Sequence, residues 1–368
     1  MRIDRLILQN FRNYREQEVS FSSGCNVISG ENAAGKTNLL EAVVYLSCGK
    51  TPRARSEREL IRFGEAAAGL KGQIYSRERN FSVEAEIPAG KRRRLSVNGV
   101  PVKTAATLSE VYNTVYFCPE DLSLIRDGAS ARRRFLDTAL CQLRPRYAAV
   151  LSEYGRIYEH KTRILRDWEE KPDLLNALPD FNERLVQCGA VLIRYRAQFA
   201  EKLKEYAAAS HRDCSGGKEE LTLRYETVSS VADPLASAEA IAEQLRRHME
   251  EHGRAELSSR LCLSGPHKDD LVLSIGGREA RTYSSQGQTR TAALALKLAE
   301  REIYKNAAGE YPVLLLDDVL SELDPKRQDF VLSRIPGGQV LITCCEEDRL
   351  PCLPDARLLR VEGGRVLE

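Results

Sequence analysis

The sequence predicts an α/β fold in which a mixed sheet with helices carries a β-rich lobe and an inserted helical arm. Three observations predict it. A glycine-rich loop at residues 30–37 follows an apolar strand and precedes an amphipathic helix. A second apolar strand, at residues 313–316, ends in two aspartates near the other end of the chain. Between them, apolar residues first alternate as in strands and then recur at helical spacing.

The loop at residues 30–37 has the pattern GxxxxGK[ST] in the strand–loop–helix context that a phosphate-binding loop requires. Backbone N–H groups of such a loop hold nucleotide phosphates, the lysine meets the β and γ oxygens, and the threonine hydroxyl binds Mg²⁺. ATP and Mg²⁺ are therefore the expected cofactors, with Lys36 as a catalytic residue. The expected nucleotide ligands are Gly30, Glu31, Asn32, Ala33, Ala34, Gly35, Lys36 and Thr37.

The strand at residues 313–316 ends in Asp317 and Asp318. Carboxylates at the end of a buried strand are costly unless they are paired or bound to metal. We expect Asp317 to hold Mg²⁺ together with Thr37, and Asp318 to orient the attacking water. This arrangement predicts that the two motif-bearing strands are neighbours in one sheet. A helix N-cap is the other interpretation of an acidic pair after a strand.

The residues between the two motifs begin with strands. Alternating or apolar runs around the first helix predict strands at 2–8, 19–21, 25–29, 69–74 and 81–87, and a helix at 37–48. Asn98-Gly99 favours the left-handed angles of a type I′ turn, which predicts a β-hairpin from strands 95–97 and 100–102. These strands form the expected β-rich lobe.

Helical spacing begins near residue 130. Apolar residues recur every three or four positions in 147–165 and again in 185–206, which predicts an antiparallel helical hairpin. An ordinary helical subdomain with the same stripe fits equally well. Residues 1–125 and 262–368 are the expected ATPase domain, and 126–261 the inserted arm.

The segment after the arm predicts the remaining elements in turn. A strand is expected at 221–228, and Asp233-Pro234 is a good start for a helix to residue 251. Strands at 271–275, 313–316 and 340–343 are expected to complete the sheet, with a helix at 289–305 before the second of them.

Composition limits the classes of function. The formal net charge is only +2, so nucleic-acid binding would have to use local basic patches. Our DNA-contact candidates are Arg53, Arg55, Lys91, Arg92, Arg93 and Arg94. The ten cysteines include no CxxC pair, which disfavours a zinc site. With no signal-peptide core and no run of roughly 18 apolar residues, we expect a cytoplasmic protein without a membrane contact.

Two short segments decide the class of ATPase. Ser284–Gln288 precedes an Ala- and Leu-rich helix, and Ser321-Glu322-Leu323-Asp324 follows the aspartate pair. In this order they resemble the signature motif, Walker B motif and D-loop of the ABC ATPases. That resemblance implies a nucleotide sandwiched between two copies. Ser285, Gly287 and Gln288 of one copy would then meet the phosphates held by the other copy's loop.

Five further segments are similar to the RecF family of bacterial recombination mediators: residues 10–14, 32–41, 117–122, 132–137 and 264–270. RecF proteins are similar to the heads of SMC proteins, with a short arm replacing the long coiled coil. The resemblance implies an ATP-dependent homodimer that binds gapped or double-stranded DNA and single-/double-strand junctions. It also implies slow, DNA-stimulated ATP hydrolysis used as a switch, and partnership with RecO and RecR in loading RecA. Arg12 is carried over as a phosphate contact.

The sequence departs from the common ABC pattern in ways that predict slow hydrolysis. Asp318 is one methylene shorter than the usual catalytic glutamate, and Cys344-Cys345 stands where a switch histidine is expected. Glu120 is a weak candidate for the Q-loop residue. His267 fits either a nucleotide-linked role or a loop-fixing hydrogen bond. The alternative function, the nucleotide-binding subunit of an ABC transporter, is disfavoured by the missing histidine and the helical insertion.

Overall fold

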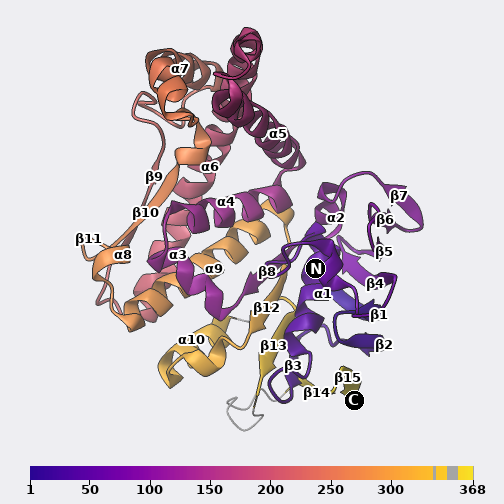
Figure 1. The fold of residues 1–368 in the computed structure, drawn as a ribbon. Helices are drawn as coiled ribbons and strands as arrows, with labels where there is room; N and C mark the ends of the chain where they lie inside the picture. The colour runs from indigo at the N-terminus through magenta and orange to yellow at the C-terminus, as the bar shows by residue number, and fades with distance from the viewer. Residues whose placement is uncertain (335–336, 346–354, 368) are drawn as a thin grey trace. The chain divides into compact units, whose positions relative to one another are not determined.

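The computed structural model describes residues 1–334, 337–345 and 355–367, and it divides into two compact units (Figure 1). Unit 1 comprises residues 1–122, 213–216 and 290–368, and unit 2 comprises residues 123–212 and 217–289. The expected domain ranges differ at the second junction, since residues 262–289 belong to unit 2. The physical reason is that β10 (Asp270–Ile275) pairs with β9 (Leu221–Glu226) of the same unit.

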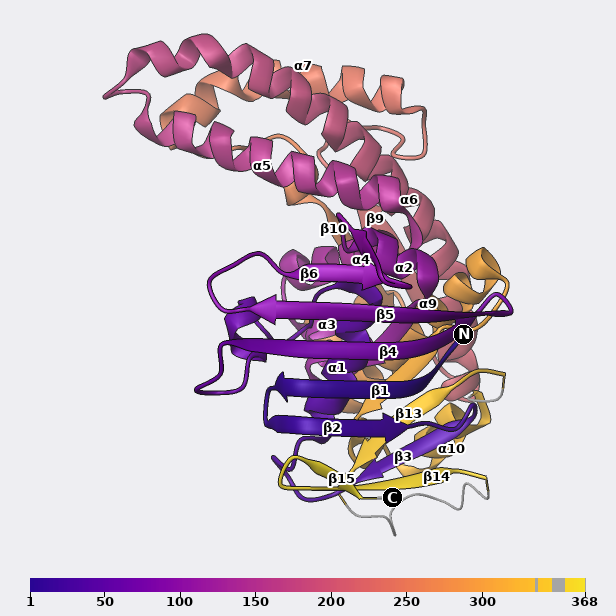
Figure 2. The same cartoon turned by 90° about the vertical axis from the view of Figure 1, so that its right-hand side faces the viewer.

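The first sheet of unit 1 is the expected β-rich lobe. Its six strands are antiparallel in the order β2-β1-β4-β5-β6-β7, and Figure 2 shows most of them side by side. They are β1 Arg2–Phe11, β2 Tyr14–Ser20, β4 Ala67–Ser76, β5 Arg79–Pro88, β6 Arg94–Val97 and β7 Val100–Val102. At the β6–β7 turn, Asn98 and Gly99 have φ of 51° and 75°. These left-handed angles confirm the predicted hairpin.

The second sheet of unit 1 carries both nucleotide motifs. Its order is β15-β14-β3-β13-β12-β8, parallel except for β15. The strands are β3 Cys25–Ser29, β8 Thr114–Phe117, β12 Val313–Asp317, β13 Val340–Cys344, β14 Arg357–Glu362 and β15 Arg365–Leu367. The prediction that the motif-bearing strands are neighbours is wrong, because β13 pairs with both β3 and β12. Residues 271–275 were also expected here, but they pair with β9 in unit 2.

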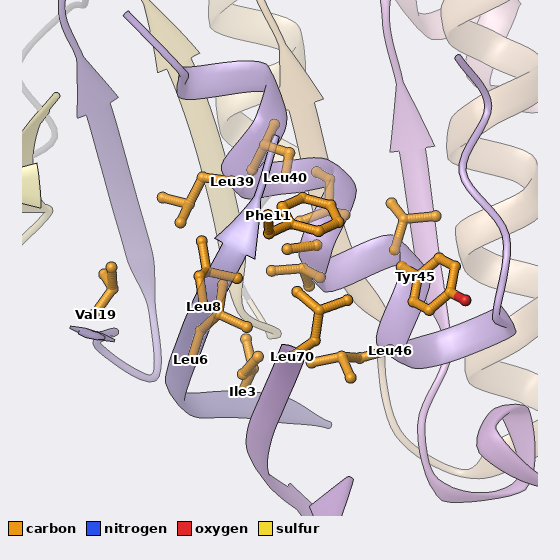
Figure 3. Close-up of a cluster of buried hydrophobic side chains, with 14 of the residues drawn as sticks. Ile3, Leu6, Leu8, Phe11, Val19, Leu39, Leu40, Tyr45, Leu46 and Leu70 are labelled. Carbon is orange, nitrogen blue, oxygen red and sulfur yellow. The ribbon is translucent and has the colours of Figure 1, made fainter. Parts of the chain in front are cut away.

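Helix α1 (Lys36–Cys48) packs against strands of both sheets. Its buried Leu39, Leu40 and Leu46 join side chains from the β-rich lobe, among them Leu6 and Leu70, in one core (Figure 3). Burying one such side chain stabilises the fold by about 1.5–3 kcal/mol. This core therefore anchors the helix that follows the phosphate-binding loop. The other α-helices of unit 1 in the described ranges are α2 Ala106–Val111, α10 Pro325–Arg334 and most of α9 Gln286–Ala308, whose first residues belong to unit 2.

Unit 2 is mainly helical. Its helices are α3 Ser123–Arg126, α4 Ala129–Leu143, α5 Pro145–Asp167, α6 Leu178–Cys214, α7 Ala238–Ser259 and α8 Ala280–Tyr283, with the last residues of α6 assigned to unit 1. The rings of Tyr147 and Tyr195 meet edge to face, and His160 stacks on Phe181. From the first contact to the second, the residue number rises along α5, from 147 to 160, and falls along α6, from 195 to 181. The two helices therefore run antiparallel and form the predicted hairpin.

The starts of α7 and α9 differ from the prediction, and α7 continues to Ser259 rather than ending at residue 251. Helix α7 begins at Ala238 rather than at Pro234, because the Ser237 hydroxyl accepts a hydrogen bond from Ala240 N at 3.2 Å and caps the helix. Asp233 instead accepts from Leu235 N at 2.9 Å, which closes a local turn. Helix α9 (Gln286–Ala308) starts before the expected residue 289. Among the helices of the described ranges, none has the length and apolar character of a membrane span.

Candidate nucleotide-binding site

Two glycines give the phosphate-binding loop its path. The loop connects β3 to α1, and Gly30 and Gly35 have φ of 149° and 123°. A Cβ at Gly30 would lie 2.3 Å from the Val361 carbonyl oxygen, and one at Gly35 would lie 2.6 Å from Asn13 Nδ2. Any larger residue at either position would clash with its neighbours, so the loop closes only with glycine.

The N-terminus of α1 is prepared for an anion. No side chain caps the helix, and its first turn contains no acidic residue. Asn13 Nδ2 donates to the Ala34 carbonyl at 2.8 Å, and the Tyr14 hydroxyl donates to the Gly35 carbonyl at 3.0 Å. These bonds brace the loop through its carbonyl oxygens. The positive end of the helix dipole therefore remains available to phosphate.

Lys36 is held inside the loop. Its ammonium donates to the carbonyls of Gly30 at 2.6 Å and Glu31 at 2.9 Å. The Cys345 thiol lies 3.7 Å from the same ammonium and donates to Asn32 Oδ1 at 3.0 Å. The position at which the sequence analysis expects a switch histidine is thus occupied by a cysteine that lies beside the loop.

The two expected Mg²⁺ ligands lie together. The Thr37 hydroxyl, at the start of α1, donates to Asp317 Oδ1 at 2.9 Å, although β13 separates β12 from β3, the strand that leads into the loop. Asp317 also accepts from the Thr343 hydroxyl at 2.8 Å and, through Oδ2, from the Tyr116 hydroxyl at 2.6 Å. Hydroxyl and carboxylate oxygens are the ligands that Mg²⁺ prefers, so this donor set fits the ion.

The intervening strand β13 also positions Asp318. Thr343 Oγ1 accepts from Asp318 N at 2.8 Å while its own proton goes to Asp317. Asp318 has φ of 55°, an uncommon conformation for a residue other than glycine. The Ser321 hydroxyl hydrogen-bonds the Asp318 carbonyl and carboxylate at 2.8 and 3.0 Å. These contacts hold Asp318 in an unfavourable backbone conformation, as is common at functional sites. The side chain of Glu322, next to Ser321, lies outside the described residues.

Sequence reasoning missed Thr343, Tyr116 and Asn13. The first two are polar positions inside short apolar strands, VLITC and TVYF, and such positions at the end of a buried strand were the available signal. Asn13 lies in the family-like segment 10–14, which gives no sign of a contact with the loop. Its bond to the loop depends on the β1–β2 turn meeting α1, which local patterns do not encode.

Arg12 is engaged within the protein. Its guanidinium donates to the Glu41 carboxylate at 3.1 and 3.2 Å, and to the Glu59 carbonyl at 3.0 Å. Glu41 is fully buried in α1, and this burial raises the pKa of its carboxyl while Arg12 opposes the rise. Arg12 therefore holds a buried carboxylate in place, and its predicted phosphate contact stays a prediction.

The signature segment forms a capping box at the start of α9 in unit 2. Ser285 Oγ accepts from Gln288 N at 3.2 Å, and Gln288 Oε1 accepts in return from Ser285 N at 2.8 Å. Gln288 also donates to Glu219 at 2.9 Å. Ser285 is exposed, with Gly287 following in the first turn of the helix. The segment thus presents a hydroxyl and a helix N-terminus to solvent.

His267 fixes a loop of unit 2. Its two ring nitrogens contact the Tyr154 hydroxyl at 2.7 Å and the Cys262 carbonyl at 2.9 Å. Burial lowers the pKa of its imidazole to about 4, so the ring is neutral near pH 7. These contacts favour the loop-fixing interpretation over a nucleotide-linked role.

The predicted DNA contacts differ in availability. The side chains of Arg53, Arg55, Lys91, Arg92 and Arg94 are exposed. Arg93 is half-buried, donates to the Gly49 carbonyl and Glu57, and lies over the ring of Tyr45. Arg92, Arg93 and Arg94 line a groove on the β-rich lobe together with Lys71 and Lys103. Arg93 has a structural task there, so Arg92 is the better phosphate candidate.

Comparison with known proteins identifies the family. A family model described as "RecF/RecN/SMC N terminal domain" matches residues 2–355. The chain is 36% identical to the DNA replication and repair protein RecF of Bacillus subtilis (strain 168), and the alignment covers 100% of both. This chain belongs to the RecF family. A second relative of the same description, from Agathobacter rectalis, is 37% identical over 94% of this chain and 92% of its own length.

Solved structures agree with the family. The "recombination mediator protein RecF-ATP in RecFOR pathway" superposes with a TM-score of 0.91 at 32% identity, covering 99% of this chain and 96% of the other. The Smc head domain of Pyrococcus furiosus, bound to part of ScpA, superposes with a TM-score of 0.58 at 16% identity, over 99% and 95% of the two chains. The second likeness concerns the fold alone. Together they confirm the predicted ABC-type ATPase head with an inserted helical arm.

Proposed function

We propose that this chain is an ATP-dependent DNA-binding protein of recombinational repair and replication restart. The observation that carries the proposal is the Thr37–Asp317 contact at 2.9 Å beside an uncapped helix N-terminus. It joins the two halves of a phosphate and Mg²⁺ site in a member of the RecF family. The RecF relative whose structure carries ATP supports the choice of nucleotide.

In this proposal each residue of the site has one task. Gly30 to Thr37 bind the phosphates through backbone N–H groups, and Lys36 leaves its carbonyl partners to meet the β and γ oxygens. Thr37 and Asp317 hold Mg²⁺, which would supply charge neutralisation at the phosphates. Asp318 orients water for attack on the γ-phosphate. Its short side chain and the cysteine at position 345 predict slow turnover.

The second half of the site is proposed to come from another copy of the chain. Ser285 presents an exposed hydroxyl at a helix N-terminus, a geometry suited to a phosphate. The signature of one copy, Ser285 with Gly287 and Gln288, would cap the nucleotide held by the other copy. ATP that binds the dimer better than the monomer then drives association by mass action.

DNA is the proposed partner of the ATP-bound dimer, in the form of gapped or double-stranded DNA and single-/double-strand junctions. The exposed arginines at positions 53, 55 and 92, with Lys91, are the proposed phosphate contacts. Affinity should fall steeply with salt as each contact releases counterions. RecO, RecR and RecA-type proteins are the proposed protein partners, since a RecF relative is described as a mediator in the RecFOR pathway.

A mixing experiment tests the shared site. Lys36→Met damages the loop and Ser285→Arg damages the signature, so neither variant alone should dimerise with ATP in size-exclusion chromatography. A mixture of the two can assemble one intact half-site, and we expect it to recover a substantial fraction of the wild-type dimer. A wild-type protein that stays monomeric in ATP, with and without DNA, would contradict the proposal. A mixture that recovers nothing would contradict sharing of the site.

A further inference from the structure

Phe63 is the most exposed large apolar side chain in the described ranges, at 103% relative exposure. It follows a 3₁₀ turn at Glu57–Leu60 and precedes β4. The side chain adds nothing to the core of unit 1. A single exposed apolar side chain is common on protein surfaces, so the role of Phe63 has to be argued from the turn that carries it and from the charges beside it.

The turn that carries Phe63 is held in place. Glu65 N donates to the Arg62 carbonyl at 3.0 Å, and Gly64 has φ of 88°, the angle that a type II turn requires of its third residue. Arg62 N donates to the Asn10 carbonyl at 2.8 Å. Because both ends of the turn are bonded, the ring is presented by ordered backbone. A partner that contacts it would lose less conformational entropy than one that orders a loose loop.

Arg62 links this turn to the phosphate-binding loop. Its guanidinium donates to the Asn13 carbonyl at 2.8 Å, and Asn13 Nδ2 donates to the Ala34 carbonyl at 2.8 Å. Asn13 Oδ1 also accepts from Asn38 of α1 at 2.8 Å. Two hydrogen bonds therefore connect Arg62, the residue before Phe63, through Asn13 to the phosphate-binding loop.

The chain just before Phe63 is basic on its surface. Arg53, Arg55 and Arg58 are exposed, and of the two glutamates in this stretch Glu57 is half-buried while Glu59 is exposed. Glu57 pairs with Arg93, and Glu59 accepts from the Arg55 backbone at 3.2 Å and from the Ser56 hydroxyl at 3.3 Å. Cationic side chains with an exposed aromatic ring are the combination that binds single-stranded nucleic acid, by phosphate contact and base stacking.

We propose that Phe63 stacks on an unpaired base of DNA while the neighbouring arginines contact the adjoining phosphates. The ring then distinguishes gapped DNA from continuous duplex, in which every base face is already stacked. This inference rests on the proposed DNA-binding function and adds the residue that reads unpaired bases. The link through Arg62 and Asn13 places that reading element next to the ATP switch.

The test compares Phe63→Ala and Phe63→Trp with wild type in the presence of ATP. Binding is measured to gapped DNA carrying 2-aminopurine in the gap and to continuous duplex of the same length. Phe63→Ala should weaken binding to gapped DNA about tenfold, the order of loss for one stacked base, and leave duplex binding within about twofold. Phe63→Trp should restore the affinity and quench 2-aminopurine fluorescence. The matched control is Val100→Ala, at the exposed start of β7, which should change neither affinity.

Salt titration separates stacking from charge. Phe63→Ala should lower the affinity for gapped DNA without changing the slope of log K against log salt, whereas Arg55→Ala should reduce the slope. Equal losses on gapped and duplex DNA, or none on either, would overturn the role of Phe63 while leaving DNA binding standing. If Phe63→Ala binds DNA normally but no longer binds a protein partner, the proposed role of Phe63 in DNA binding would be overturned and a protein contact would replace it. A wild-type protein that binds neither DNA would instead refute the proposed function itself.

Discussion

Asp317 accepts hydrogen bonds from three hydroxyl groups, and each comes from a different element of unit 1. Thr37 belongs to α1, Tyr116 to β8 and Thr343 to β13. A proposed Mg²⁺ ligand is therefore oriented from both neighbouring strands as well as from the phosphate-binding loop. Partners of this kind commonly affect metal affinity 10- to 100-fold.

Replacing Tyr116 with phenylalanine tests that orientation. Tyr116→Phe removes the bond to Asp317 Oδ2, so we expect the Mg²⁺ concentration for half-maximal ATP binding to rise about tenfold. Tyr112→Phe is the matched control, because that buried tyrosine donates only to the Val43 carbonyl at 2.6 Å. Both variants should lose about 1 kcal/mol of stability, measured by urea unfolding. An equal Mg²⁺ requirement in the two variants would show that Tyr116 is structural only.

His267 predicts a pH dependence for the stability of unit 2. Its folded pKa of about 4 lies below the unfolded value of about 6.5, so the unfolded state binds more protons between these two pH values. Stability contributed by neutral His267 is complete above pH 6.5 and is lost as pH falls towards 4, by about 3 kcal/mol at most. His267→Gln should make the free energy of unfolding depend less steeply on pH between about pH 4 and 6.5, as measured by urea unfolding at a series of pH values.

At the scale of elements, the N-terminus of α9 combines a helix cap with a proposed phosphate contact. Aspartate caps helices as well as serine does, but its charge repels phosphate. Ser285→Asp should therefore keep the thermal stability of the chain and abolish ATP-dependent dimerisation, as measured by light scattering. The same substitution at the α7 cap, Ser237→Asp, is the matched control and should leave dimerisation intact. Dimerisation by Ser285→Asp at wild-type ATP concentrations would remove Ser285 from the nucleotide site.

Elements were predictable where a local rule specifies the structure. Asn98-Gly99 requires a particular turn, and the loop at residues 30–37 requires a strand before it and a helix after it. The order of the strands was not predictable, because β3, β8, β12 and β13 are all short buried strands in a parallel sheet. Nothing local decides which of them lies next to another.

The misplaced start of α7 has a similar cause. Asp233 and Ser237 are both good caps, and only the contacts around them decide between a turn and a helix. In the candidate site, too, local motifs were predictable and contacts between distant segments were not. Its motif residues were readable from spacing, whereas Tyr116 and Thr343 depend on which strands flank β12.

At the scale of the whole molecule, the phosphate-binding loop and the signature belong to different compact units of one chain. If each nucleotide is shared between two copies, ATP should slow hydrogen exchange at the backbone amides of both segments. The protection of the loop and that of the signature should depend differently on protein concentration. Binding to the loop needs one copy, whereas covering of the signature needs two. Hydrogen exchange at two protein concentrations can separate these events.

With saturating ATP, amides of residues 30–40 should be protected at low and high protein concentration alike. Amides of residues 284–290 should gain protection only at the concentration where the dimer forms. Ser285→Arg should retain the first protection and lose the second, because its loop still binds nucleotide while its signature cannot cap a partner's phosphate. Lys36→Met should lose both. Protection of residues 284–290 in a dilute monomer would mean that a chain closes its signature on its own nucleotide, and the two-copy site would then be abandoned.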